Sequence, residues 1–171
     1  MVCRYEFTLT GDEDGTTHVE IPMNSFVARR RSAAPTYLSV VIRNLEYSAA
    51  IAARSNGDMQ IEIVHYLQGV EVDRSTLVSV HLDDIRVDEG ASSGSITLTG
   101  YQQYTYVQAS VEIQDVTYKQ LKDGEYRYRC ASIDPDLDPG DTIVDGSTTF
   151  TSDEIQYIVN ATSQIMEVKG V

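Results

Sequence analysis

The residues from Tyr126 to the C-terminus alternate between apolar and polar side chains in short runs that turn sequences separate. Tyr126, Tyr128 and Cys130 alternate with two arginines, and a period of two is the pattern of a strand with one buried face and one wet face. The Asp-Pro-Gly-Asp sequence at 138–141 predicts a turn, because Pro fixes φ and Gly adopts conformations that other residues avoid. This stretch therefore predicts a series of short antiparallel strands, without helical periodicity.

The rest of the chain continues this pattern, with one segment that is typical of a helix. Val, Ile, Thr and Tyr make up 57 of the 171 residues, and these residue types fit a pleated, half-buried surface. Around Glu46–Arg54, several alanines and one apolar face favour a short helix that ends at Asn56 and Gly57. We expect a mostly β fold, a single antiparallel β-barrel or sandwich with long hairpins and this one short helix.

The length of the chain suits one domain with its own hydrophobic core. We therefore expect a single β domain over 1–171. Residues 1–35 would supply an N-terminal hairpin and a basic docking segment, and residues 36–171 would form the barrel core.

The chain is acidic, with 13 Lys and Arg against 26 Asp and Glu and a formal net charge of −13. This balance argues against nucleic-acid binding, which requires a basic footprint. No apolar run approaches the length of a membrane span, and the N-terminus lacks the apolar core of a signal peptide. We expect a protein made in the cytoplasm, with no sequence-specific nucleic acid partner and no membrane insertion of its own.

Cys3 and Cys130 are the two cysteines, too few and too far apart in sequence for a metal cage or a disulfide framework. One bridge between them is an open alternative. Two buried free thiols are the favoured interpretation.

Arg29, Arg30 and Arg31 form a basic run in this acidic chain. In a docking segment, arginines would form bidentate pairs with carboxylates of another subunit. Alternatively, they neutralise carboxylates of this same chain. A nucleic-acid clamp ranks third, because no aromatic stacking platform or further basic cluster accompanies them. We treat the three arginines as candidate interface residues.

Tyr101, Tyr104 and Tyr106 cluster around two glutamines. Their rings would suit stacking on a sugar, and tyrosine-rich patches serve protein interfaces at least as well. The three tyrosines complete the set of candidate interface residues.

No group of residues has the spacing of a catalytic site. The histidines, His18, His65 and His81, each lie in a strand pattern without a partner at ligand spacing. The sequence contains no nucleophile elbow, P-loop or dinucleotide fingerprint.

Asp134, Asp136 and Asp138 are the strongest metal candidates, because they occupy positions 1, 3 and 5 of a calcium-loop pattern. That pattern requires Gly at position 6, where this chain has Pro139. We therefore expect an acidic turn, no metal or other cofactor, and no enzymatic activity.

Two parts of the chain resemble tail-tip (baseplate hub) proteins of long-tailed bacteriophages. The first is AIAARSNGDM at 50–59, which precedes a strand. The second comprises Arg129-Cys130, DLDPGDT at 136–142, Phe150, IQY at 155–157 and MEV at 166–168. In that family the Pro-Gly-Asp turn leads into a hairpin of a small β-barrel, and the barrels form a ring around the tail axis.

The resemblance implies a structural virion protein of a phage tail that is assembled in the host bacterial cytoplasm. It would be a ring-forming subunit of the tail tip or hub that acts by assembly rather than catalysis. Its implied partners are the chain itself, as a trimer or hexamer ring, and neighbouring tail proteins. Hub proteins are often longer than this chain, so hub, distal-tail and tail-completion roles stay open.

The alternative is a β-sandwich module that binds carbohydrate or a host surface, with or without calcium. Such a module would use the three tyrosines and the loop at 134–138.

Overall fold

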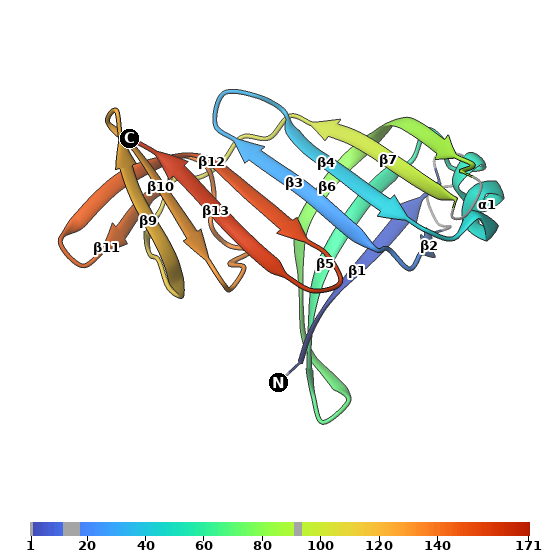
Figure 1. Ribbon diagram of the computed structural model, residues 1–171, viewed down its shortest axis with the longest axis horizontal. Coiled ribbons are helices and arrows are strands. Elements are labelled where there is room, and N and C mark those ends of the chain that lie inside the picture. The colour runs from blue at the N-terminus through green and yellow to red at the C-terminus, as the bar shows by residue number, and fades with distance from the viewer. Residues whose placement is uncertain (1, 12–17, 91–93) are drawn as a thin grey trace. The chain divides into compact units, whose positions relative to one another are not determined.

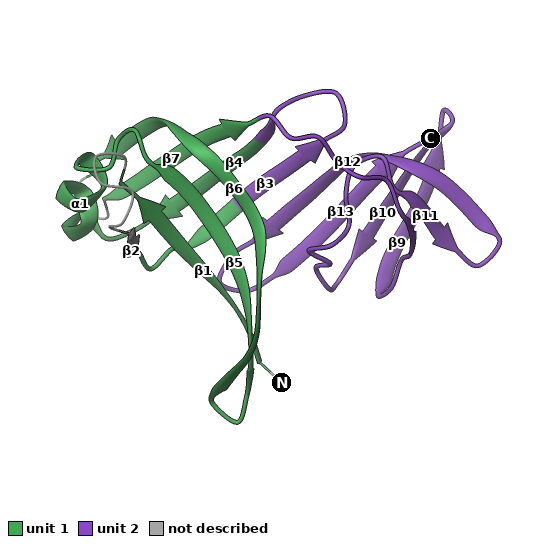
Figure 2. Cartoon of the chain, turned by 180° about the vertical axis from the view of Figure 1, so that it is seen from behind, with its two compact units in different colours: residues 1–26, 37–102 green, residues 27–36, 103–171 purple. Residues whose placement is uncertain are grey.

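The computed structural model describes residues 2–11, 18–90 and 94–171 (Figure 1). The chain divides into two compact units. Unit 1 comprises residues 1–26 and 37–102, and unit 2 comprises residues 27–36 and 103–171 (Figure 2). The described residues are mostly β with one short α-helix, so the predicted fold class is confirmed. The expectation of a single domain with a docking segment at 1–35 stays a prediction.

Unit 1 is a curved antiparallel sheet with strands in the order β2-β1-β5-β6-β7-β4. Neighbouring strands align their apolar residues on one side, and Phe7 lies opposite Ile61, which lies opposite Val78. All three are buried, and burying such a side chain contributes about 1.5–3 kcal/mol. The strands are β1 Val2–Thr10, β2 His18–Glu20, β4 Thr36–Ile42, β5 Asp58–Leu67, β6 Val70–Asp88 and β7 Ser95–Gln102.

The segment 21–24 connects β1 to β4. The Ile21 N–H donates to the Phe7 carbonyl at 3.0 Å, and the Asn24 N–H donates to the Val41 carbonyl at 2.8 Å. Within the described residues, β1 and β4 are joined by this segment and do not pair with each other as strands. Unit 1 is therefore barrel-like without a closed ladder of strands.

The predicted helix around Glu46–Arg54 is present in a shorter form. A 3-10 turn, η1 Leu45–Tyr47, runs into the α-helix α1 Ser48–Ala52. The Asn44 side chain starts it by accepting a hydrogen bond of 3.0 Å from the Glu46 N–H. After it, Gly57 lies so close to the Thr10 carbonyl that a Cβ would meet the oxygen at 1.6 Å, so only glycine fits there.

Unit 2 contains the strands that follow β4 in the strand order, β3-β12-β13-β10-β9. Strand β11 pairs antiparallel with β12 and parallel with β8. Strand β3 begins at the end of unit 1 and continues in unit 2. The strands are β3 Ser25–Arg31, β8 Ser110–Glu112, β9 Val116–Lys122, β10 Glu125–Cys130, β11 Thr142–Asp145, β12 Thr148–Val159 and β13 Gln164–Gly170.

The core of unit 2 includes an aromatic group from β10 and β12. The ring of Tyr126 stacks on Phe150 with 4.8 Å between centroids, and Tyr128 meets Phe150 edge-on at 5.1 Å. Tyr157 of β12 is fully buried. The alternation seen in the sequence from Tyr126 onward thus corresponds to strands with one side in this core.

Both cysteines are free thiols. Cys130 is buried in unit 2, as the sequence favoured, whereas Cys3 is exposed at the start of β1. Across the described parts of the chain, no helix is long and apolar enough to span a bilayer.

Candidate functional site

The three candidate arginines lie at the end of β3, where alternation sends them to opposite sides of the sheet. Phe26 and Ala28 are buried, and Arg30 follows on the same side, toward the core of unit 2. Arg29 and Arg31 lie on the other side. The run of three arginines therefore has two different surroundings, which the sequence alone does not distinguish.

Arg30 is enclosed by the loop that carries the acidic candidates. Its side chain is 13% exposed and forms a salt bridge through Nη2 with Asp138. Its Nη1 donates to the Leu137 carbonyl at 3.0 Å, the Pro135 carbonyl at 3.2 Å and the Tyr157 hydroxyl at 3.2 Å. The guanidinium carbon also lies 5.2 Å from the centre of the Tyr106 ring.

Tyr106 and Tyr157 complete this group, which we name the Arg30 cluster (Arg30, Tyr106, Asp138 and Tyr157). The Tyr106 hydroxyl lies 2.6 Å from the Thr36 hydroxyl. The Tyr157 hydroxyl donates to the Asp134 carbonyl at 3.4 Å, and burial raises its pKa, so it stays protonated. The cluster fastens the loop at 134–138 to β3 and β12.

The Asp-Pro-Gly-Asp turn next to the cluster is held by the carboxylate of Asp141, which is 1% exposed. One oxygen accepts from the Ala109 N–H at 2.6 Å and the other accepts from the Asp138 N–H at 2.7 Å. The Ser152 hydroxyl donates to the Asp138 carbonyl at 2.9 Å. Gly140 has a φ of 98°, a conformation that favours glycine. The predicted turn is therefore present, and a buried carboxylate organises it.

The three loop aspartates do not converge on a common point. Asp134 accepts a hydrogen bond of 3.0 Å from the Asp136 N–H in a local turn, while Asp138 pairs with Arg30. Within the described residues, no three His, Cys, Asp or Glu side chains are grouped so as to hold a metal ion. Two of the three candidate carboxylates, those of Asp134 and Asp138, therefore have partners within the chain itself.

The three candidate tyrosines fall on both units. Tyr101 of β7 is exposed in unit 1, where its ring lies 5.3 Å from the Tyr37 ring. Tyr104 is exposed in unit 2, with its ring 6.0 Å from the ring of Tyr106. The role of these tyrosines as interface residues stays a prediction.

On the other side of the unit 2 sheet, ion pairs run across neighbouring strands. Glu167 of β13 is almost fully buried and accepts from Arg127 and Arg129 of β10, at 2.9 Å each. Lys169 lies 2.7 Å from Glu154 of β12. Arg31 of β3 pairs with the same Glu154, at 2.5 Å.

These pairs shift the pKa of both glutamates. Burial raises the pKa of each carboxyl, and the hydrogen bonds from the basic side chains outweigh it, so both pKa values lie below the ordinary range. Arg31 thus neutralises a carboxylate of its own chain, as Arg30 does. The sequence shows Arg127 and Arg129 as one wet face of a strand, and it contains no signal for their partner.

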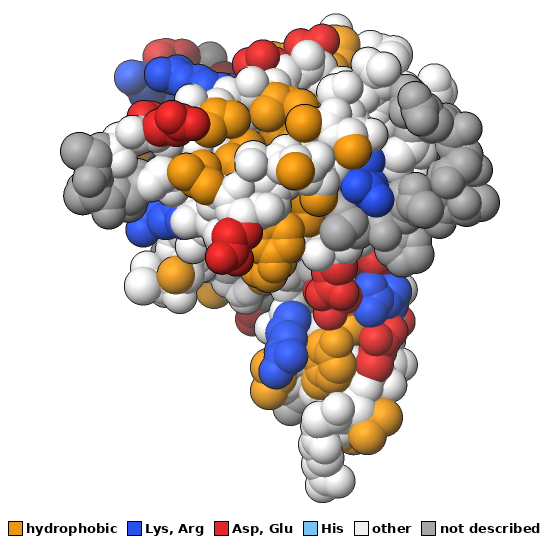
Figure 3. Space-filling view, turned by 90° about the vertical axis from the view of Figure 1, so that its right-hand side faces the viewer, with side chains coloured by type: hydrophobic (Ala, Val, Ile, Leu, Met, Phe, Trp, Pro, Cys, Tyr) orange, Lys and Arg blue, Asp and Glu red, His pale blue; other side chains and the backbone are white. Residues whose placement is uncertain are grey.

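A hairpin arm projects from unit 1. It is formed by the end of β5, the start of β6 and the first residues of β1 (Figures 1 and 3). Its turn has φ of 53° at Gln68 and 83° at Gly69. Exposed apolar residues cluster on it, with exposed fractions of 53–66%: Val2, Leu67, Val70 and Val72. Such a cluster is typical of a contact surface.

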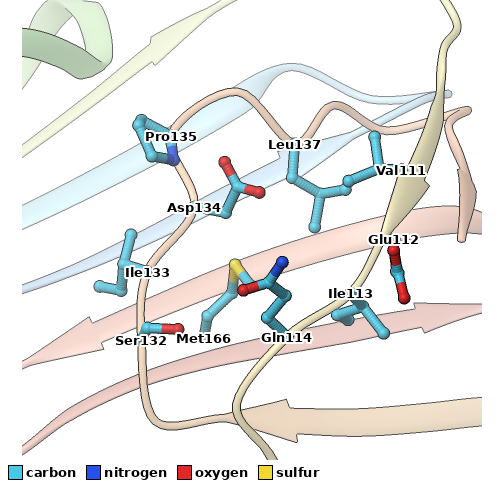
Figure 4. Close-up of a pocket in the computed structure, with 10 residues that line it drawn as sticks. All are labelled: Val111, Glu112, Ile113, Gln114, Ser132, Ile133, Asp134, Pro135, Leu137 and Met166. Carbon is cyan, nitrogen blue, oxygen red and sulfur yellow. The ribbon is translucent and has the colours of Figure 1, made fainter. Parts of the chain in front are cut away.

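One cavity of about 330 Å³ lies in unit 2, between the end of β8 and the loop at 132–137 (Figure 4). Its lining is partly apolar, from Ile113, Leu137 and Met166, and carries two carboxylates, Glu112 and Asp134. The residues that line it include no histidine, cysteine or basic group.

The fold of this chain is one that tail proteins have. The 43 kDa tail protein of prophage MuSo2 from Shewanella oneidensis is similar with a TM-score of 0.59 and 7% identity, over 98% of this chain and 97% of that chain. A tail protein from Neisseria meningitidis is similar with a TM-score of 0.59 and 7% identity, over 99% of this chain and 96% of that chain.

A third structure is an Escherichia coli component of the type VI secretion system, described as similar to the T4 bacteriophage tail proteins gp27 and gp5. It gives a TM-score of 0.54 at 5% identity, over 96% of this chain and 76% of that chain. No protein-family model matches the sequence, and no curated protein matches it. The resemblance to phage tail proteins that the sequence predicted is therefore confirmed at the level of the fold.

Proposed function

We propose that this chain is a structural subunit of a bacteriophage tail, part of a ring in the tail tip or baseplate hub, which acts by assembly and not by catalysis. The observation that carries the proposal is the likeness of nearly the whole chain, 96–99% of it, to two tail proteins and to a component of the type VI secretion system. Its place would be the tail of the virion, after assembly in the cytoplasm of the host bacterium.

The partners in this proposal are other copies of the chain, as a trimer or hexamer ring, and neighbouring tail proteins. The hairpin arm supports it, because Val70 and Val72 expose apolar surface that a partner would cover. Of the candidate interface residues, Arg29 on the outer side of β3 and the exposed Tyr101 and Tyr104 are those we propose for contacts between subunits. Arg30 and Tyr106 would support the interface from inside unit 2.

The test is the mass of the purified chain, measured by size-exclusion chromatography with light scattering over a range of concentrations, with negative-stain images of the same fractions. We expect three or six times the monomer mass, and rings in the images. A chain that stays monomeric at every concentration, and that is absent from purified tails of the phage that encodes it, would contradict the proposal.

The contribution of the arm is tested with Val70→Ser combined with Val72→Ser. We expect weaker association and an unchanged melting temperature, since both side chains are already in water in the monomer. Val107→Ser is the matched control, because Val107 is 85% exposed and lies outside the arm.

A further inference from the structure

The outer side of the unit 2 sheet is basic, although the chain as a whole is acidic. Pairing between strands places six basic residues on this side, and we name it the basic face: Arg29 and Arg31 of β3, Lys122 of β9, Arg127 and Arg129 of β10, and Lys169 of β13. These are six of the 13 Lys and Arg in the chain. The same side carries three of the 26 Asp and Glu: Glu125, Glu154 and Glu167.

The carboxylates of the basic face are outnumbered by its bases. Glu154 and Glu167 are shared among Arg31, Arg127, Arg129 and Lys169. With four bases to two carboxylates, this face has positive charge to spare, which a carboxylate from outside would balance.

Unit 1 has the opposite charge, with 14 Asp and Glu against five Lys and Arg, a net of −9. Its clearest acidic stretch is the end of β6 with the residue that follows, which exposes Asp83, Asp84, Asp88 and Glu89. None of these four forms an ion pair within the part of the chain that the structure describes. Asp84, Arg86 and Asp88 alternate along β6, opposite Thr99, Thr97 and Ser95, and so share one side of the strand.

We propose that the basic face of one copy docks against the acidic end of β6 in a second copy. The inference rests on the proposed function, because it names the contact by which copies would assemble. The contact joins two different surfaces, so it repeats head to tail and can close into a ring. Complementary charges of this kind fix the register of partners and exclude wrong ones.

The mixed charge of both surfaces favours a protein partner over a nucleic acid. Glu154 and Glu167 lie among the bases of the basic face, and Arg86 lies between two aspartates on β6. These glutamates would repel a polyanion, whereas Arg86 of a second copy can pair with one of them. A chain with a net charge of −13 also repels a phosphate backbone.

The experiment measures self-association by analytical ultracentrifugation at several salt concentrations. Asp84→Lys with Asp88→Lys changes the acidic side, and we expect association weakened about tenfold or more, because like charges then face each other. Glu20→Lys with Asp136→Lys is the matched control, with the same change in net charge at exposed positions that belong neither to the end of β6, nor to the hairpin arm, nor to the basic face. We expect the wild-type chain and this control to associate alike, and both to weaken as salt rises.

The basic side is tested with Lys122→Glu, an exposed position, and with Arg127→Gln plus Arg129→Gln after their melting temperatures are checked. Lys122→Glu combined with the two β6 substitutions should recover part of the lost association, as a charge swap does. If the β6 variant associates as tightly as its control, the docking proposal is wrong and assembly by another surface stands. If the wild-type chain does not associate at all, the docking proposal fails, and the ring proposal fails with it where the chain is also absent from purified tails.

A labelled DNA duplex, added to the same samples, tests the competing occupant. We expect no binding at physiological salt. Binding that the Arg127 and Arg129 variant loses, together with unchanged self-association of the β6 variant, would assign the face to a polyanion and overturn the proposal.

Discussion

Arg30 and Asp138 are 108 residues apart in the sequence and form a salt bridge inside unit 2. The same guanidinium bonds two backbone carbonyls of the loop that carries Asp138, so a single side chain of β3 holds that loop in place. Arginine suits this position because its planar fork of donors can reach several acceptors at once.

Replacing Arg30 should therefore destabilise unit 2. We expect Arg30→Met to lower the free energy of unfolding by about 3 kcal/mol, the low end of the range for breaking a buried pair, because Asp138 keeps some contact with water. Urea unfolding measures the loss. Arg29→Met, the neighbour on the outer side of β3, is the control, and we expect a change within about 1 kcal/mol. Equal losses for the two variants would contradict the assigned role of Arg30.

A second prediction concerns Asp141, because its buried carboxylate accepts hydrogen bonds from two backbone N–H groups, those of Ala109 and Asp138. Asp141→Ala leaves both donors without a partner, which should cost about 1–3 kcal/mol of unfolding free energy. Asp136→Ala, an exposed change in the same acidic stretch, should have little effect. If the Asp141 variant unfolds at the wild-type urea concentration, the turn is held by other contacts.

The ion pairs of Glu154 and Glu167 predict how stability depends on pH. Their pKa values in the folded chain lie below the ordinary value of 4.5, because the neighbouring bases outweigh the effect of burial. A lowered pKa means that this stabilisation is fully present above about pH 4.5 and is lost as the pH falls through the folded pKa. We expect the free energy of unfolding to fall on acidification below that value.

Glu154→Gln with Glu167→Gln should make this acid-induced loss smaller, as urea unfolding at a series of pH values would show. Glu89→Gln is the control, because this exposed carboxylate forms no ion pair in the described part of the chain. If the free energy of unfolding falls in parallel with pH in the wild type and the double variant, the ion pairs are not the source of the acid-induced loss of stability.

The two cysteines should differ sharply toward a thiol reagent. Cys130 is 1% exposed, and burial raises its pKa to about 11, so little reactive thiolate forms near neutral pH. Cys3 is exposed and should be the thiol that reacts in the native protein. In the native protein, Ellman's reagent should thus react quickly with one thiol. After unfolding it should react with two, and in the native Cys3→Ser variant it should react quickly with none. Two fast thiols in the native protein would show that unit 2 opens around Cys130.

Local sequence patterns predicted the elements of this protein. The period-two alternation and the turn at 138–141 correctly gave strands and a turn, and the alanine-rich stretch gave the helix, because strand, turn and helix preferences act between residues close in sequence. The helix is shorter than predicted: its regular part ends at Ala52, and the chain must pass close to the Thr10 carbonyl at Gly57. The exposure of Val70 and Val72 on the hairpin arm does not follow from the sequence pattern, because it depends on what packs over them.

The sequence by itself thus determined a β-rich, acidic chain with an arginine run, an acidic turn and a resemblance to tail proteins. Only the tertiary structure decided that Arg30 meets Asp138 while Arg31 meets Glu154, and that basic residues of four strands gather on one side of unit 2. The physical reason is that alternation fixes which side of a strand a residue takes, whereas its partner depends on the order and register of strands distant in the sequence. Ion pairs across strands are therefore a property of the fold and not of any segment.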